Sequence, residues 1–123
     1  MSSNFILVVD DDEAIRSFLK MALQEEGYGV VLASNGQEAL QRTEEQTFSL
    51  IVLDMRMPIM DGWEFLEQFE KHLEGEGKNC KVFMLSSSIN PEDIDKSKNY
   101  KSVCEFLSKP LTPDKFKELL LSV

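Results

Sequence analysis

The stretch Leu50-Ile51-Val52-Leu53, which Asp54 follows directly, is the most informative part of the sequence for fold class. Four consecutive apolar residues are typical of a strand that is covered on both faces, as in a parallel sheet between helices. Further short apolar runs lie in residues 5–9, 30–32, 81–85 and 103–107. Longer segments separate these five runs, and this alternation predicts an α/β fold of repeated βα units.

The segments between the predicted strands have the features of helices. After the first strand, apolar residues recur three and four residues apart, at Ile15, Phe18, Leu19, Ala22 and Leu23. This spacing predicts a helix that packs on the sheet and ends at Gly27. Typical helix starts follow at Asn35 with Glu38, Asp61 with Glu64, Asn90-Pro91, and Thr112-Pro113-Asp114. The polar segment 96–101 predicts that the fourth helix is short.

Composition limits the classes of function. A chain of 123 residues fits one domain, and its net charge of −9 disfavours direct binding to nucleic acids or anionic membranes. No apolar run approaches the length of a membrane span. Cys80 and Cys104 form no CxxC pair, so we expect a reducing cytoplasm and two small buried hydrophobic residues. Proteins and cations are the expected partners.

Polar residues that could bind a ligand or take part in catalysis follow four of the predicted strands. They are Asp10-Asp11-Asp12, Asp54, Ser86-Ser87-Ser88 and Lys109-Pro110. In open α/β sheets, ligands bind beyond the carboxyl ends of the strands, so these residues belong to one edge. If the first and third strands are neighbours, Asp10, Asp11 and Asp54 crowd together, and their repulsion raises their pKa values unless a cation intervenes.

A hard divalent cation suits such a site. Mg²⁺, or Mn²⁺ in its place, prefers carboxylate and water oxygens, whereas zinc is disfavoured because neither cysteine lies near this edge. The acids could instead merely cap the first helix. Capping needs one carboxylate, which we assign to Asp12, so it leaves Asp10 and Asp11 unexplained.

Four motifs in this order closely resemble the receiver domains of two-component response regulators. The motifs are Val8-Val9-Asp10-Asp11-Asp12, Leu53-Asp54-Met55-Arg56-Met57-Pro58 with Met60-Asp61-Gly62, Leu85-Ser86-Ser87, and Phe106-Leu107-Ser108-Lys109-Pro110. The resemblance spans essentially the whole chain and implies one receiver domain over residues 1–123. It also implies a flavodoxin-like, doubly wound (βα)5 fold with strand order 2-1-3-4-5.

The resemblance also implies roles for single residues. Asp54 matches the residue that accepts a phosphoryl group from a phosphohistidine on a sensor histidine kinase or a histidine phosphotransfer protein. Asp11, Asp54 and the backbone carbonyl of Arg56 match metal ligands, and Asp10 matches a residue that holds the metal largely through water. The chain is then a phosphoacceptor that assists its own phosphorylation and autodephosphorylation, and not an enzyme acting on other substrates.

Three more matched positions concern the response to phosphorylation. Ser86 matches the hydroxyl residue that hydrogen-bonds the phosphoryl group, and Lys109 matches the lysine that pairs with the acceptor carboxylate. Ser86 and Phe106 together match the switch pair, and the Lys109–Pro110 peptide bond is cis in this family. We therefore expect a protein-binding surface that switches, a downstream protein target, and a monomer or phosphorylation-dependent dimer.

The sequence departs from the commonest receiver pattern at three places. Phe106 stands where many members have Tyr, and Ser86 stands where Thr is more frequent. The segment Tyr100-Lys101-Ser102 replaces a common Gly-Ala pair, which leaves the geometry between the fourth helix and the fifth strand open.

Two other classes of protein, a phosphatase and an FMN carrier, share part of this pattern. A haloacid-dehalogenase-like phosphatase also uses an Asp nucleophile and Mg²⁺, but it needs a second acid two residues further on, where this chain has Arg56. A flavodoxin-like FMN carrier would place its phosphate against Asp10, Asp11 and Asp12, where their charge opposes it. With no output unit after the last predicted helix, we expect the output to be another molecule.

Overall fold

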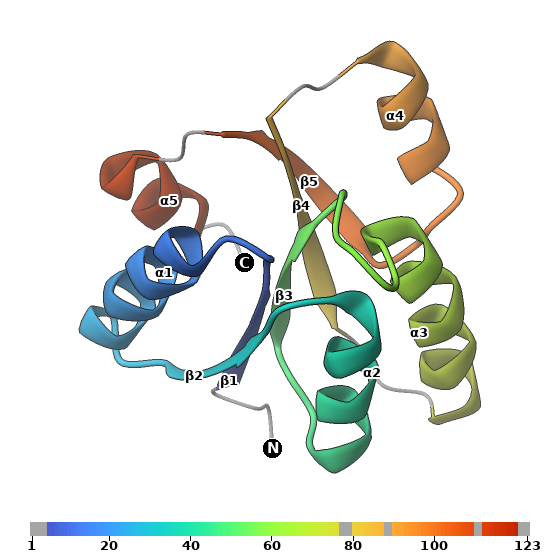
Figure 1. Cartoon of the computed structure of the whole chain (residues 1–123), viewed down its shortest axis with the longest axis horizontal. Coiled ribbons are helices and arrows are strands. Elements are labelled where there is room, and N and C mark those ends of the chain that lie inside the picture. The colour runs from blue at the N-terminus through green and yellow to red at the C-terminus, as the bar shows by residue number, and fades with distance from the viewer. Residues whose placement is uncertain (1–4, 77–79, 88–89, 110–111, 121–123) are drawn as a thin grey trace.

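The computed structural model describes residues 5–76, 80–87, 90–109 and 112–120 (Figure 1). Strands and helices alternate along the chain, as predicted. The strands are β1 (Phe5–Val9), β2 (Gly29–Ala33), β3 (Leu50–Asp54), β4 (Lys81–Ser86) and β5 (Val103–Ser108). The helices are α1 (Glu13–Glu25), α2 (Gly36–Glu45), α3 (Gly62–Glu76), α4 (Pro91–Ser97) and α5 (Pro113–Leu120).

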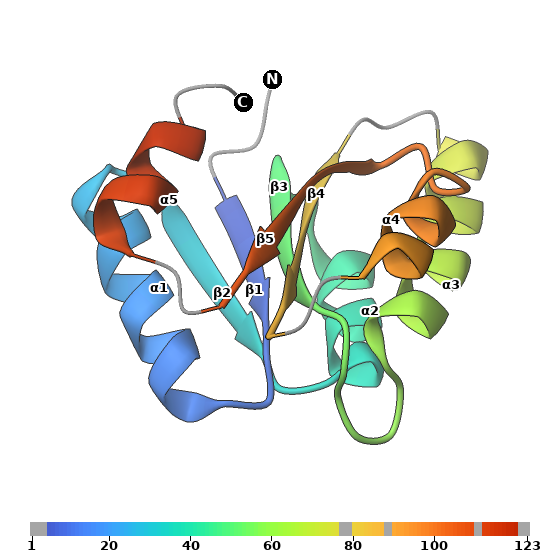
Figure 2. The same ribbon diagram turned by 90° about the horizontal axis from the view of Figure 1, so that it is seen from above.

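The five strands form one parallel sheet in the order β2-β1-β3-β4-β5, which confirms the predicted fold class and strand order. Helices α1 and α5 cover one face of the sheet, and α2, α3 and α4 lie on the other side (Figures 1 and 2). Strand order reverses between β1 and β3, so the carboxyl ends of these two strands flank the crevice where ligands bind in such folds.

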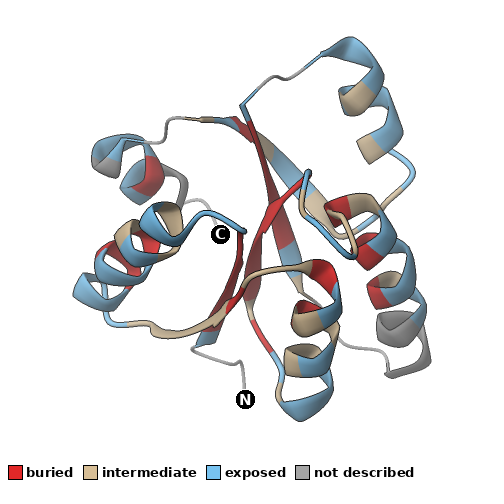
Figure 3. Cartoon of the chain, viewed as in Figure 1, coloured by how far each residue is buried: buried red, intermediate tan, exposed pale blue. Residues whose placement is uncertain are grey.

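The core consists of two layers, one on each face of the sheet. Every residue of β3 is buried, and the central strands form the buried interior in Figure 3. Alternate residues of β1 enter opposite layers: Ile6 packs in the layer that contains Phe116 of α5, and Leu7 packs in the layer that contains Phe65 of α3. This arrangement explains why the strand sequences are apolar throughout rather than alternating.

The helix boundaries agree with the sequence signals. Gly27 has a φ of +92° just beyond α1, and its N–H and that of Tyr28 bond to the carbonyls of Gln24 and Leu23. α4 has only seven residues, as predicted. Among the described residues, no helix combines the length and the apolar character needed to cross a bilayer.

The expectation of two buried cysteines is wrong for Cys104. Cys80 is partly buried, whereas Cys104 is exposed on β5, which is an edge strand of the sheet. The pairing of β4 with β5 shifts register between Val82 and Phe83, opposite the position of Cys104. An edge strand with such an irregularity leaves part of its length uncovered, and residue type alone does not reveal this.

Candidate functional site

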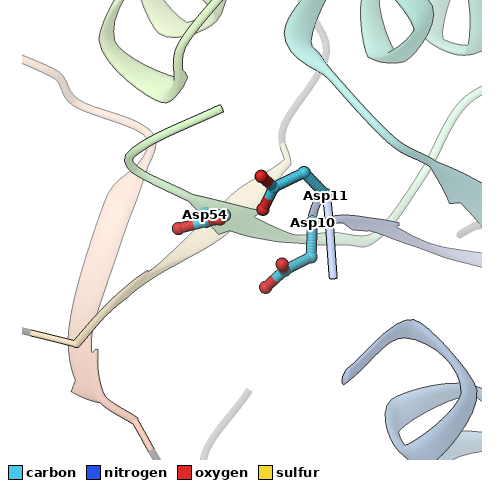
Figure 4. Close-up of side chains that lie close together, drawn as sticks. All are labelled: Asp10, Asp11 and Asp54. Carbon is cyan, nitrogen blue, oxygen red and sulfur yellow. The ribbon is translucent and has the colours of Figure 1, made fainter. Parts of the chain in front are cut away.

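The carboxyl ends of β1 and β3 bring three carboxylates together. Asp10 and Asp11 follow β1, Asp54 ends β3, and one oxygen atom from each lies within 4.8 Å of the others (Figure 4). Asp10 and Asp54 are buried and Asp11 is exposed, so the cluster is open to solvent on one side. These all-oxygen donors fit a hard divalent cation that keeps some of its water.

Lys109 contributes a positive charge to this cluster from the end of β5. Its Nζ lies 3.0 Å from Oδ2 of Asp10 and 3.5 Å from Oδ2 of Asp54. Its backbone N–H donates to the carbonyl of Ser86 at 2.8 Å, which fixes the chain just beyond the sheet. Burial lowers the pKa of Lys109, but the hydrogen bonds and charges of Asp10 and Asp54 outweigh it and leave the pKa raised. The side chain is therefore a cation at neutral pH.

The pKa of Asp54 is raised, but burial contributes more to this rise than the repulsion between carboxylates that the sequence predicts. Burial is the largest cause and the charge of Asp10 is the next, while Lys109 and the N–H of Arg56 act in the opposite direction. Together with a smaller contribution from Asp11, these effects raise the pKa of Asp54 to about 6. Ionised Asp54 is thus costly in the metal-free protein, and a bound cation would relieve that cost.

Asp10 is held in place by hydrogen bonds of its Oδ1, its backbone carbonyl and its backbone N–H. Its Oδ1 accepts a hydrogen bond from the N–H of Asp12 at 2.9 Å, and its carbonyl accepts one from Nη1 of Arg16 at 2.7 Å. Its own N–H donates to the carbonyl of Ala33 at 3.1 Å. Asp12 caps α1 by accepting the N–H of Ala14 at 2.9 Å, as predicted. The sequence does not predict the role of Arg16, because a lone Arg on a helix carries no motif.

The β3–α3 loop, residues 55–61, wraps closely around the end of β3. The N–H of Arg56 donates to Oδ1 of Asp54 at 3.3 Å, and the N–H of Gly62 donates to the carbonyl of Met55 at 3.0 Å. Ile59 has a φ of +69°, and the N–H of Met60 bonds across it to the carbonyl of Pro58 at 2.7 Å. Such a γ-turn at a β-branched residue is rare and strained, which marks the loop as a constrained part of the site.

The contact of Gly62 with β3 leads to a prediction. A Cβ atom at this position would lie 2.5 Å from the carbonyl oxygen of Asp54, so Gly62→Ala must push the start of α3 away from β3. We expect a loss of about 1–3 kcal/mol in the free energy of unfolding, measured in urea, and weaker Mg²⁺ binding, measured by calorimetry. Gly27→Ala is the matched control, because its positive φ costs a similar amount while nothing lies within 4 Å. Equal Mg²⁺ affinities in the two variants would contradict the prediction.

Ser86 and Phe106, the other described residues that the sequence predicts for the site, lie on the neighbouring strands β4 and β5. Ser86 is buried and follows Leu85, the residue paired with Asp54 between β3 and β4. Phe106 is half-buried on β5 and packs on the core layer that contains α3. Pro110 lies outside the described residues, and so does the predicted cis peptide bond that precedes it.

An apolar cavity of about 450 Å³ adjoins the charged cluster. Its lining comes from one side of α1, the end of β4 and Lys109: Ala14, Ile15, Phe18, Leu19, Leu85, Ser87 and Lys109. The site thus combines buried charges with an apolar surface on its rim. The sequence predicts that the apolar residues of α1 pack against the sheet, and it gives no sign of this cavity.

Comparisons with known proteins agree with this geometry. The model of the response regulator receiver domain family matches residues 6–121. The transcriptional regulatory protein SrrA of Staphylococcus aureus is 34% identical over 122 residues, which are 98% of this chain and 46% of SrrA. The chain therefore spans about half the length of the curated relatives it matches.

Solved structures of similar proteins have the same fold. The chemotaxis protein CheY4 of Vibrio cholerae superposes with a TM-score of 0.87 at 30% identity, over 100% of this chain and 99% of that one. A CheY-like response regulator receiver domain protein of Methanospirillum hungatei superposes with a TM-score of 0.86 at 32% identity, over 98% of this chain and 93% of that one.

Proposed function

Because this chain belongs to the response regulator receiver domain family of two-component signalling, we propose that it accepts a phosphoryl group on Asp54 in a Mg²⁺-dependent reaction. The donor is a phosphohistidine on a sensor histidine kinase or a histidine phosphotransfer protein. The observation that carries the proposal is the convergence of Asp10, Asp11, Asp54 and Lys109 at one sheet edge.

The donor atoms present fit Mg²⁺, or Mn²⁺ in its place. We assign Asp11, Asp54 and the backbone carbonyl of Arg56 as direct ligands. Asp10 acts largely through water, because Asp12 and Lys109 already engage its two carboxylate oxygens. When bound, the cation neutralises charge on the transferring oxygens and favours ionised Asp54.

The protein's own residues supply the rest of the chemistry. An oxygen of ionised Asp54 attacks phosphorus, the bond from phosphorus to the donor's imidazole nitrogen breaks, and an acyl phosphate forms. Lys109 then pairs with the phosphoryl oxygens, and the hydroxyl of Ser86 donates a hydrogen bond to them. Arg56 is exposed and stands where a dehalogenase-like phosphatase would need an acid, so turnover of other phosphate esters is not supported.

Proteins are the proposed partners on both sides of this reaction. A donor protein must approach Asp54 across the rim, where the cavity beside Lys109 offers apolar surface for it to bury. The net charge of −9 argues against direct nucleic-acid contact, so a downstream protein is the proposed target. We place this chemistry in the cytoplasm, in a single receiver domain over residues 1–123 that acts as a monomer or a phosphorylation-dependent dimer.

The test is phosphorylation by a small donor. Incubation with acetyl phosphate and Mg²⁺ should add the mass of one phosphoryl group, and a chelator should prevent the gain. Reduction of the acyl phosphate with borohydride, followed by peptide mass spectrometry, should place the modification on Asp54. A modification on another residue, or an equal yield without a divalent cation, would overturn the proposal.

A further inference from the structure

Trp63, on the first turn of α3, contacts the ring of Phe106 across to β5. The centroids of the two rings lie 6.4 Å apart, with an angle of 42° between their planes. Aromatic rings in this tilted arrangement attract one another through their edges and faces. Because Phe106 matches the switch residue of receiver domains, Trp63 is a direct neighbour of the side chain that is expected to move.

The same Trp63 ring also contacts α4 and the turn that follows it. The Nζ of Lys96, near the end of α4, lies 4.8 Å from the centroid of the Trp63 ring. The ring of Tyr100, in the turn between α4 and β5, lies 5.8 Å from it at an angle of 34°. One side chain of α3 therefore touches the switch strand, the last turn of α4 and the segment that joins them.

Glu70, two helical turns beyond Trp63, holds the same segment by its carboxylate. The backbone N–H groups of Lys101 and Ser102 donate to it at 3.3 Å and 2.7 Å, and the hydroxyl of Ser102 donates as well. These residues belong to the segment that replaces the common Gly-Ala pair of receiver domains. Charge-assisted bonds to a carboxylate are stronger than neutral ones, so the α4–β5 turn is fastened to α3.

The first turn of α3, which carries Trp63, also lies beside Asp54, the proposed acceptor. Gly62 precedes Trp63 and lies so close to the Asp54 carbonyl that a Cβ atom would be 2.5 Å from it. The first turn of α3 is thus fixed against β3, and Trp63 projects from it towards the switch. Trp63 therefore connects a turn held beside Asp54 with the side chains that it contacts on β5, on α4 and in the turn between them.

We propose that Trp63 is a positioning residue that transmits the rotation of the Phe106 ring to α4. This inference rests on the proposed function, since we expect the ring to turn when Asp54 is phosphorylated. When Phe106 turns inward, Trp63 loses an aromatic neighbour, and its contacts with Lys96 and Tyr100 repack. Packed side chains change between discrete arrangements, so the end of α4 shifts with them.

Fluorescence provides a direct test, because Trp63 is the only tryptophan in the sequence. With acetyl phosphate and Mg²⁺, we expect the emission maximum to move to longer wavelength as the ring loses cover from Phe106 and gains contact with water. In Phe106→Leu, which has no ring to withdraw, the shift should disappear while the phosphoryl mass is still gained. A full mass gain with unchanged wild-type emission would overturn the inference and leave the proposed function standing.

Nuclear magnetic resonance tests whether the movement reaches α4. In wild type, amide signals of residues 91–101 should shift on phosphorylation, and in Trp63→Leu these shifts should fall to less than half. Tyr28→Leu is the matched control, because Tyr28 packs in the opposite core layer, and its shifts should equal those of wild type. Undiminished shifts in Trp63→Leu would overturn the inference. Failure of wild type to gain the phosphoryl mass would instead overturn the proposed function, and this inference with it.

Discussion

An Asp54→Asn variant should gain no phosphoryl mass from acetyl phosphate and Mg²⁺, and its metal-free form should be more stable than wild type at neutral pH. The amide lacks the nucleophilic carboxylate oxygen. It also removes a buried negative charge that Asp10 and Asp11 repel. Because the pKa of Asp54 is raised from 3.8 to about 6, ionising it in the folded protein costs up to about 3 kcal/mol of stability.

The stability difference between Asp54→Asn and wild type should depend on pH. Well below its ordinary pKa of 3.8, Asp54 is protonated in both the folded and the unfolded chain, so the variant and wild type should differ little. As the pH rises from about 4 to about 6, the unfolded chain releases this proton while the folded chain keeps it, and wild type loses stability relative to the variant. Above that range the difference should be constant in the metal-free protein.

Thermal unfolding at several pH values, with a chelator and with Mg²⁺, measures the pH dependence of stability and the stabilisation that the metal adds. Mg²⁺ should raise the midpoint of wild type much more than that of Asp54→Asn, because binding to the folded state adds stability. Asp95→Asn is the matched control: Asp95 is an exposed acid on α4, 3.4 Å from Lys98. Its removal should change stability by less than about 1 kcal/mol at every pH. A difference between Asp54→Asn and wild type that does not vary with pH would contradict the explanation.

Much of the fold follows from local sequence because the local signals and the tertiary arrangement agree. The apolar run that ends at Leu53 predicts a covered strand, and β3 is buried throughout. Asp61 and Glu64 predict the start of α3, and there the N–H of Glu64 donates to Oδ1 of Asp61 at 2.9 Å. The clustering of Asp10, Asp11 and Asp54 follows in turn, because parallel strands place their carboxyl ends at one edge.

Other features depend on contacts between distant segments, which local patterns do not encode. Glu70 and Ser102 are 32 residues apart in sequence, and nothing in either segment indicates that they hydrogen-bond. The contact of Lys96 with the ring of Trp63 depends on how α4 lies beside α3. The exposure of Cys104 follows from its place on an edge strand. Such features arise from the packing of whole elements, and the sequence alone leaves that packing open.

The position of Lys109 between Asp10 and Asp54 leads to a prediction with effects of opposite sign. In Lys109→Met, the rate of phosphorylation by acetyl phosphate should fall on the order of 10²–10³-fold, because a charged donor to the transferring oxygens is lost. Mg²⁺ affinity should instead rise by roughly tenfold, because a positive charge 3.5 Å from Asp54 no longer repels the metal.

Lys98→Met is the matched control, since Lys98 is an exposed lysine that directly follows α4 and pairs only with Asp95 among the ion pairs described. It should change neither the rate nor the affinity. Calorimetry gives the Mg²⁺ affinity, and intact mass against time at saturating Mg²⁺ gives the rate. The saturating metal also compensates the carboxylates that Lys109→Met leaves unpaired, so loss of folding does not explain a slow reaction. If Mg²⁺ affinity and phosphorylation rate both fall, Lys109 only supports the structure of the site. If the rate falls while the affinity rises, Lys109 acts on the phosphoryl group during its transfer.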